Sequence, residues 1–219
     1  MRTVKFLVAL VPMAALASGC SWSNKAKGAV IGAGAGGAAG AVVGHATGST
    51  VRGAIIGAAV GGAAGAVIGH QMDQQAHELA YDMPGAVVQR VGEGITVTFP
   101  NGVLFGDNSD QLLPDAQENM RKYAESLNKY PDTHALIVGH TDSRGSNVYN
   151  KDLSERRAAQ AASFVALQGV DRGRLTTAGK GEDEPVATND NVEGQAQNRR
   201  VEIAIYHNTP PSGTPTGGQ

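Results

Sequence analysis

The chain is short of cysteine and of net charge, and its first apolar run is brief. Cys20 is the only cysteine among 219 residues, so no disulfide can form within the chain. Lysine and arginine number 18 against 20 aspartate and glutamate, and no basic cluster indicates a nucleic-acid partner. The apolar run at residues 6–16 is too short to span a bilayer, which takes about 20 residues.

Residues 1–19 have the features of a secretory signal peptide. Positive residues precede the apolar run, and small residues lead from it into Cys20. This segment resembles a bacterial lipobox, which makes Cys20 the lipidated first residue of the mature protein and residues 20–27 a lipidated N-terminus and spacer. Ala17 stands where a lipobox usually has leucine. The alternative is a cleaved signal peptide that leaves a free thiol.

Ser21 follows the cysteine. In Gram-negative lipoproteins an aspartate at this position usually signals retention in the inner membrane, so by that resemblance Ser21 favours the outer membrane. Acyl chains such as palmitate on Cys20 would anchor the protein stably, because two lipid signals already suffice. The sequence therefore predicts a lipid-anchored protein of the Gram-negative envelope, in the outer membrane and facing the periplasm.

Two glycine-rich blocks, residues 27–45 and 52–70, agree at most positions and form an internal duplication. In each block glycine recurs at every fourth residue, which on a helix lines one face with a smooth groove. Glycine costs about 1 kcal/mol relative to alanine in a helix. Such a helix therefore needs a partner backbone in its groove, usually in lipid. Residues 28–70 are predicted to form a glycine-zipper helical hairpin.

Two placements of this hairpin fit its composition. In the first it inserts in the membrane, where its glycine faces allow self-association. In the second it lies on the membrane or packs against itself in the periplasm. His45 and His70 end the two blocks with no carboxylate or thiol beside them, so we interpret them as helix-end residues and predict no metal site.

Less apolar sequence follows the hairpin. Residues 71–85 are a polar, helix-favouring linker that ends at Met83-Pro84-Gly85, where we place a domain boundary. Residues 208–219 offer nothing apolar to bury, and we predict a disordered tail. The segment between them, residues 86–207, has a common size for a single domain.

The pattern of apolar residues within 86–207 predicts both strands and helices. Alternating or short apolar runs favour strands, and apolar residues at helical spacing, with Pro114 at a helix start, favour helices. The expected elements are strands at residues 87–91, 95–99, 135–138, 175–179 and 201–206 and helices at 114–130 and 153–167. This order makes an α+β sandwich in which the helices cover one face of a mixed sheet.

Three groups of residues in this domain carry a resemblance to a known family. They are Gly139-His140-Thr141-Asp142 with Gly145, then Asn150, Leu153-Ser154 and Arg157-Ala158, and finally Asn198-Arg199-Arg200-Val201. In this order they resemble the signature of the OmpA C-terminal-like peptidoglycan-binding domain, which implies a β-α-β-α-β-β sandwich. With the lipobox and the glycine-rich hairpin, the whole chain resembles the small OmpA-family lipoproteins. Phe105-Gly106-Asp107 departs from the Phe-Asp usual in the family's first motif.

The resemblance implies a site for diaminopimelate, whose free end in a peptidoglycan stem peptide carries an ammonium and a carboxylate on one carbon. It places Asp142 on the ammonium and Arg157 on the carboxylate, which an arginine fork binds strongly. The residues that line the cleft by the same resemblance are Asn108, Thr141, Asn150, Leu153, Asn198 and Arg199. His140 is expected to orient the loop from behind as a hydrogen-bond partner.

Structural alternatives exist for these residues. Asp142 and Arg157 could form an internal salt bridge at a helix start, and Asn198 and Arg199 could cap and brace the last strand. A hydrolase set of His140, Asp142 and Ser143 is the catalytic alternative.

Strand alternation argues against the hydrolase set. It places His140 and Asp142 on one face with Ser143 on the other, so the three do not form a triad. A metal at His140 and Asp142 would lack a third ligand. We therefore predict no enzyme and no cofactor.

The predicted function is a tether between membrane and cell wall. In it the lipid-anchored chain binds peptidoglycan non-covalently through the diaminopimelate of stem peptides. The alternative is a membrane-inserted or oligomeric glycine-zipper protein whose OmpA-like domain is a spacer that binds nothing.

Overall fold

The computed structural model describes residues 49–61 and 66–207. The predictions for the signal peptide, for Cys20, for the first glycine block and for the C-terminal tail lie outside these residues. The described elements, in chain order, are α2 (Thr50–Gly61), α3 (Ala66–Asp82), β1 (Val87–Val91), β2 (Gly94–Pro100), α4 (Asn101–Leu104), α5 (Pro114–Lys129), β3 (Thr133–His140), α6 (Asn147–Leu167), η2 (Arg172–Arg174), β4 (Leu175–Gly181), α7 (Val192–Asn198) and β5 (Arg200–His207).

The strands form a five-stranded mixed sheet in the order β1-β2-β5-β3-β4. Strands β3 and β4 pair in parallel, and β1–β2, β2–β5 and β5–β3 pair antiparallel. The hairpin between β1 and β2 turns at Gly92, whose φ of 53° lies in the left-handed region that glycine adopts without strain. The α+β class with a mixed sheet, predicted from the sequence, is confirmed.

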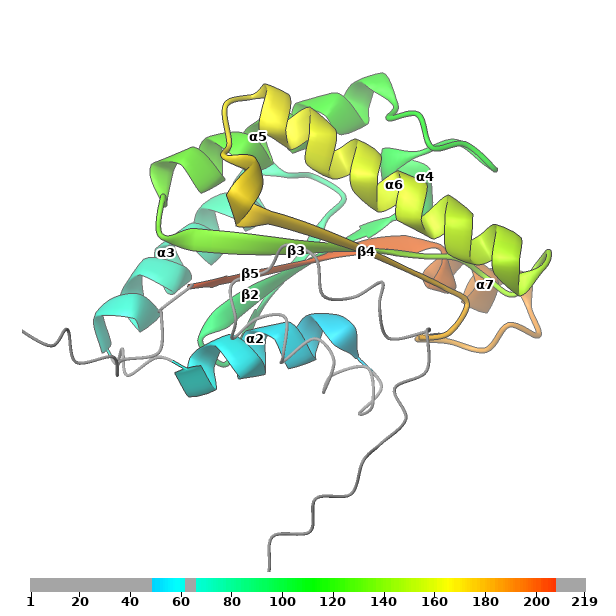
Figure 1. Ribbon diagram of the computed structural model, residues 1–219, viewed down its shortest axis with the longest axis horizontal. Helices are drawn as coiled ribbons and strands as arrows, with labels where there is room; N and C mark the ends of the chain where they lie inside the picture. Colours follow the sequence, from blue (N-terminus) through cyan, green and yellow to red (C-terminus); the bar gives the residue numbers. More distant parts are fainter. Residues whose placement is uncertain (1–48, 62–65, 208–219) are drawn as a thin grey trace, which may run out of the picture.

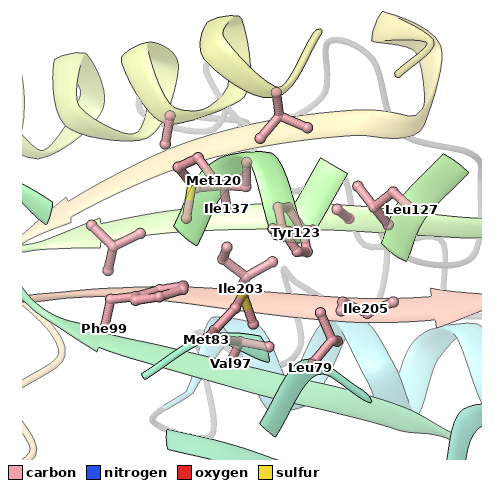
Figure 2. Close-up of a cluster of buried hydrophobic side chains, with 14 of the residues drawn as sticks. Leu79, Met83, Val97, Phe99, Met120, Tyr123, Leu127, Ile137, Ile203 and Ile205 are labelled. Atoms are coloured by element: carbon pink, nitrogen blue, oxygen red, sulfur yellow. The ribbon is translucent and has the colours of Figure 1, made fainter. Parts of the chain in front are cut away.

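The main core lies between the sheet and helices α3, α5 and α6, which share one face of it (Figure 1). Helix α5 begins with Pro114 at its first turn, where a missing N–H costs nothing. Its buried side chains recur at helical spacing and meet the apolar face of the sheet. Figure 2 shows Met120, Tyr123 and Leu127 from α5 opposite Ile137, Ile203 and Ile205 from β3 and β5.

Helix α3 differs from the polar linker predicted at residues 71–85. The segment is helical, but Met72, Ala76, Leu79 and Met83 recur at helical spacing and are buried in the main core. Polar residues dominate the composition of the helix and conceal this narrow apolar stripe. The segment is therefore packed against the domain and does not act as a free spacer.

Helix α2 contains the first part of the second glycine block and covers the opposite face of the sheet from α5 and α6 (Figure 1). The prediction placed the helices of the domain on one face of the sheet, and it made this glycine-rich segment part of a separate helical hairpin. The helix agrees with that prediction, but its place on the second face of the sheet was not predicted. A second apolar cluster joins α2 to the sheet; it contains Val51, Ala54 and Ile55 from α2 and Leu136, Val138, Ala204 and Tyr206 from β3 and β5. Among residues 49–61 and 66–207, the helices are too short or too polar to cross a membrane.

Helix α6 lies very close to β3 and β4, and two glycines make this possible. A methyl group at Gly139 would overlap the backbone carbonyl of Ser154, and one at Gly179 would overlap the backbone of Glu155. Glycine at both strand positions lets the helix backbone rest directly on the sheet. The contact fixes the first half of α6 beside the end of β3, where the predicted site residues lie.

Candidate functional site

The predicted site lies where β3 ends and α6 begins. Thr141 and Asp142 directly follow β3, and the loop after them leads into α6 through Gly145, whose φ is 102°. Ser146 caps α6 by accepting a hydrogen bond from the backbone N–H of Tyr149. Figure 1 shows the start of α6 and helix α7 at the same end of the sheet, so residues distant in sequence meet here.

Asp142 is buried and held by two arginines. Its Oδ2 accepts a hydrogen bond of 2.6 Å from Arg199 Nη1 and one of 2.9 Å from Arg144 Nε. Its Oδ1 accepts one of 3.1 Å from the backbone N–H of Arg144. Burial by itself would raise the pKa of Asp142, but the hydrogen bonds from Arg199 and Arg144 outweigh it and hold that pKa below its ordinary value. The carboxylate is therefore charged at neutral pH.

Arg157 projects from α6 and is only 2% exposed. Its Nε donates to the carbonyl of Ser109 at 2.8 Å, and its Nη2 donates to the carbonyl of Gly106 at 3.3 Å. Its guanidinium lies 5.6 Å from the centre of the Phe105 ring. Burial lowers the pKa of Arg157 from its ordinary value, although an arginine stays charged at neutral pH. The residue thus fixes the loop that precedes α5.

Asp142 and Arg157 do not pair with each other among the described residues. Asp142 bonds to Arg199 and Arg144, whereas Arg157 bonds to backbone carbonyls. Arg199 links the two, because its positive charge contributes to lowering the pKa of Arg157 while it holds Asp142 directly. We call these four residues, Asp142, Arg144, Arg157 and Arg199, the Asp142 site.

Asn150 and Thr141 adjoin Asp142. Asn150 Nδ2 donates to the Asp142 carbonyl at 3.2 Å and to Glu182 Oε2 at 2.6 Å, so it joins α6 to the chain beyond β4. The backbone N–H of Thr141 bonds to the carbonyl of Gly181 at 2.9 Å. The Thr141 hydroxyl is buried and has no hydrogen-bond partner among the described residues.

Asn108 and Leu153 are two further residues that the sequence predicts to line the cleft. Asn108 is exposed, with a left-handed φ of 51°, in the turn that Arg157 holds through the neighbouring carbonyls. Leu153 is buried on α6, one turn before Arg157. Asn108 is thus placed at the surface, while Leu153 is buried.

Asn198 braces a loop instead of facing the Asp142 carboxylate. It is fully buried, and its Oδ1 accepts hydrogen bonds from the backbone N–H groups of Val186 and Ala187 at 2.8 and 3.0 Å. Its Nδ2 donates to the Ala187 carbonyl and to Asn189 Oδ1. The side chain of Asn198 thus braces the loop at residues 186–189 and not the last strand, whereas its neighbour Arg199 contacts Asp142.

His140 does not orient the loop by a hydrogen bond, which corrects that expectation. Both imidazole nitrogens are buried without a hydrogen-bond partner among the described residues. Burial, aided by the charge of Arg200, lowers the pKa of His140 to about 3, so the ring is neutral at pH 7. His140 is bonded to neither Asp142 nor Ser143, and the described residues contain no cluster of His, Cys, Asp and Glu that could hold a metal.

The sequence did not single out Arg144, although it is part of the site. Its exposed side chain folds back onto the carboxylate two residues earlier, a contact that only the loop conformation determines. Glu182, which accepts from Asn150, was missed for the same reason. A charged residue two positions after a predicted ligand in a loop is the signal that could have indicated Arg144.

Comparison with known proteins adds two families and several relatives. The OmpA family matches residues 104–199, and the YMGG-like Gly-zipper family matches residues 1–73. The chain is 40% identical over 136 residues to the probable lipoprotein YiaD of Escherichia coli. This match covers 61% of this chain and 62% of YiaD, so the chain spans less than two thirds of the length of that relative. It is 34% identical over 130 residues to a peptidoglycan-associated lipoprotein of Agrobacterium fabrum, covering 59% of this chain and 73% of that protein.

Solved structures show the same fold. The cell wall anchor of the type VI secretion system (T6SS) from Pseudomonas aeruginosa matches with a TM-score of 0.55 and 33% identity, over 61% of this chain and 96% of that one. The periplasmic domain of Helicobacter pylori MotB matches with a TM-score of 0.52 and 25% identity, over 60% of this chain and 85% of that one.

Proposed function

The chain belongs to the OmpA family, and on that basis we propose that it binds peptidoglycan non-covalently in the Gram-negative cell envelope. Relatives named as a peptidoglycan-associated lipoprotein and as a probable lipoprotein support this place and partner. In the same proposal acylated Cys20 holds the chain in the membrane, and Ser21 favours the outer membrane facing the periplasm. The chain then tethers that membrane to the cell wall.

The observation that carries the proposal is the buried, charged carboxylate of Asp142, which Arg199 and Arg144 hold. The ligand it suits is an amino acid end that bears an ammonium and a carboxylate on one carbon, as diaminopimelate does. Asp142 would accept the ammonium. Arg157 has five N–H donors, of which backbone carbonyls engage two, so donors remain for the ligand carboxylate. This division of roles agrees with what the family resemblance implies.

Asp142 gives a sharper test than Arg157. Replacing Arg157 also frees the loop that its guanidinium holds at Ser109 and Gly106, so lost binding could reflect a displaced loop. Asp142→Asn keeps the size of the side chain and one acceptor oxygen but removes the charge. Exposed Asp132, between α5 and β3, supplies the matched control Asp132→Asn.

The assay is co-sedimentation of the full chain with purified sacculi whose stem peptides contain diaminopimelate, with free meso-diaminopimelate and Nα-acetyl-lysine amide as competitors. A hydrogen bond to a charged group is worth about 1.5–3 kcal/mol, so Asp142→Asn should bind roughly 10- to 100-fold more weakly. Asp132→Asn should bind as wild type does, and Nα-acetyl-lysine amide should not compete, because its free ammonium has no carboxylate on the same carbon. If Asp142→Asn co-sediments like wild type, the assignment of the ligand ammonium to Asp142 is wrong. If the wild-type chain itself does not co-sediment, the domain is a spacer and the glycine-zipper alternative gains support.

A further inference from the structure

Helix α2, which contains the first part of the second glycine block, has a defined place on the domain. Val51, Ala54 and Ile55 are at most 1% exposed, and they pack on the β3 and β5 side chains of the second apolar cluster. Arg52, on the same helix, points to solvent. A methyl group at Gly94, on β2, would overlap the Ile55 side chain, so helix and sheet are in close contact there. Helix α2 is thus seated on the sheet along one defined face.

A buried carboxylate fixes the start of this helix. Glu184 Oε2 accepts a hydrogen bond of 3.1 Å from the Thr50 backbone N–H, and Glu184 Oε1 accepts one of 2.6 Å from the Thr50 hydroxyl. Glu184 is 6% exposed, and Lys180 Nζ lies 3.4 Å from its Oε1. A carboxylate at a helix N-terminus is favourable because it meets free N–H groups and the positive end of the helix dipole.

The loop that carries Glu184, residues 182–191, also borders the Asp142 site. Arg200 Nη2 donates to the Glu184 carbonyl at 3.1 Å, and Asn198 holds the next part of the loop. Farther along, Asn189 Oδ1 accepts a hydrogen bond of 3.3 Å from the backbone N–H of Ser143, the residue after Asp142. One continuous loop therefore joins the N-terminus of α2 to the backbone beside the binding carboxylate.

We propose that α2 is a docking helix for the sheet, and that its seat strengthens peptidoglycan binding through loop 182–191. When α2 occupies the sheet, Glu184 is fixed by Thr50 and the loop holds the Ser143 backbone. When α2 leaves, Glu184 loses both hydrogen bonds and the loop loosens at the Asp142 site. The coupling is reciprocal, so peptidoglycan bound at the site also favours the docked helix. The ligand in this proposal rests on the proposed function.

The composition of α2 suits it both to the sheet and to a lipid surface. Arg52 is the only charged residue in Thr50–Gly61, and the remainder is small or apolar. A helix of this kind has an alternative partner in a lipid surface, which would compete with the sheet for Val51, Ala54 and Ile55. The occupant of the sheet face in the docked state is this helix of the same chain. If α2 is found in the lipid and not on the sheet, the docking proposal is wrong.

The experiment compares Ala54→Glu with Arg52→Glu in the full acylated chain in phospholipid vesicles. Both variants put a glutamate on α2, but one side chain faces the sheet and the other faces solvent. Residue-resolved amide exchange is followed in α2 and at Ser143, and sacculus binding is measured in parallel. Ala54→Glu should speed exchange in α2 and at Ser143 at least tenfold and weaken binding severalfold, whereas Arg52→Glu should change neither.

Three results would count against the idea in distinguishable ways. Fast exchange throughout α2 in the wild-type chain overturns docking. Faster exchange in α2 of Ala54→Glu with unchanged exchange at Ser143 overturns the coupling. A wild-type chain that does not bind sacculi overturns the proposed function alone, because exchange at Ser143 still decides the coupling. If Ala54→Glu unfolds the sheet, Thr50→Val decides instead, since it removes only the hydroxyl that binds Glu184.

Discussion

Replacing His140 by leucine is expected to reduce the decrease in the free energy of unfolding that occurs as the pH falls. The imidazole is 1% exposed, and burial lowers its pKa from the ordinary 6.5 to about 3. Arg200 lowers this pKa further, as do Lys180 and Lys151, while Glu184 opposes them. Between pH 6.5 and 3 the unfolded chain therefore binds a proton at His140 that the folded chain does not bind.

This difference fixes both the sign and the size of the effect. Stability falls as pH decreases wherever the unfolded state binds more protons, by about 1.4 kcal/mol for each pH unit for one group. His140 therefore contributes no loss above pH 6.5 and about 3 kcal/mol of loss by pH 4.5. That is a large share of a typical unfolding free energy of about 5–15 kcal/mol.

The assay is urea unfolding of wild type and His140→Leu at several pH values between 4.5 and 7.5. The gap between the two unfolding free energies should change by about 3 kcal/mol over this range in favour of the variant at low pH. At pH 7.5 the variant should be as stable as wild type or more so, because the buried nitrogens that it removes have no partner among the described residues. His77→Gln, at an exposed site on α3, is the control. Parallel curves for wild type and His140→Leu would refute the reasoning.

Two further predictions concern the packing of α6 and the ligand site. Gly139→Ala should destabilise the protein by about 1–3 kcal/mol or more in urea unfolding, because the methyl group overlaps the Ser154 carbonyl. Gly102→Ala, with open space around it, should not destabilise it, and equal losses would contradict the close helix contact. Arg144→Ala should tighten calorimetrically measured binding of meso-diaminopimelate by up to about fivefold, because an exposed arginine that competes for Asp142 is worth at most about 1 kcal/mol. Weaker binding would show that Arg144 assists the ligand.

The helices and strands of the domain could be predicted because their signals are local. Pro114 and the apolar spacing after it predicted α5, which ends at Lys129, one residue before the expected boundary. Helix α6 begins at Asn147, earlier than the predicted 153, because the Ser146 cap allows the polar first turns to be helical. The short helices α4 and α7 were missed, since four and seven residues offer too little periodicity to detect.

The two segments before the domain show why composition alone was a poor guide. Residues 71–85 are polar on average, yet the stripe from Met72 to Met83 belongs to the main core. The second glycine block is apolar and suggested lipid, yet α2 lies on the sheet. In both cases the partner surface is formed by strands far along the chain, so no local pattern could identify it.

The sequence by itself determined the α+β class and the order of the five strands and of the two long helices α5 and α6, because periodicity and turn residues are local properties. Only the tertiary structure decided which cation holds Asp142. Arg199 lies 57 residues away and reaches the carboxylate because β5 is inserted beside β3 in the sheet. The same long-range packing places Arg157 within hydrogen-bond distance of the Ser109 carbonyl and Thr50 within hydrogen-bond distance of Glu184. An ion pair or hydrogen bond across such a separation depends on strand order, which spacing along the chain does not encode.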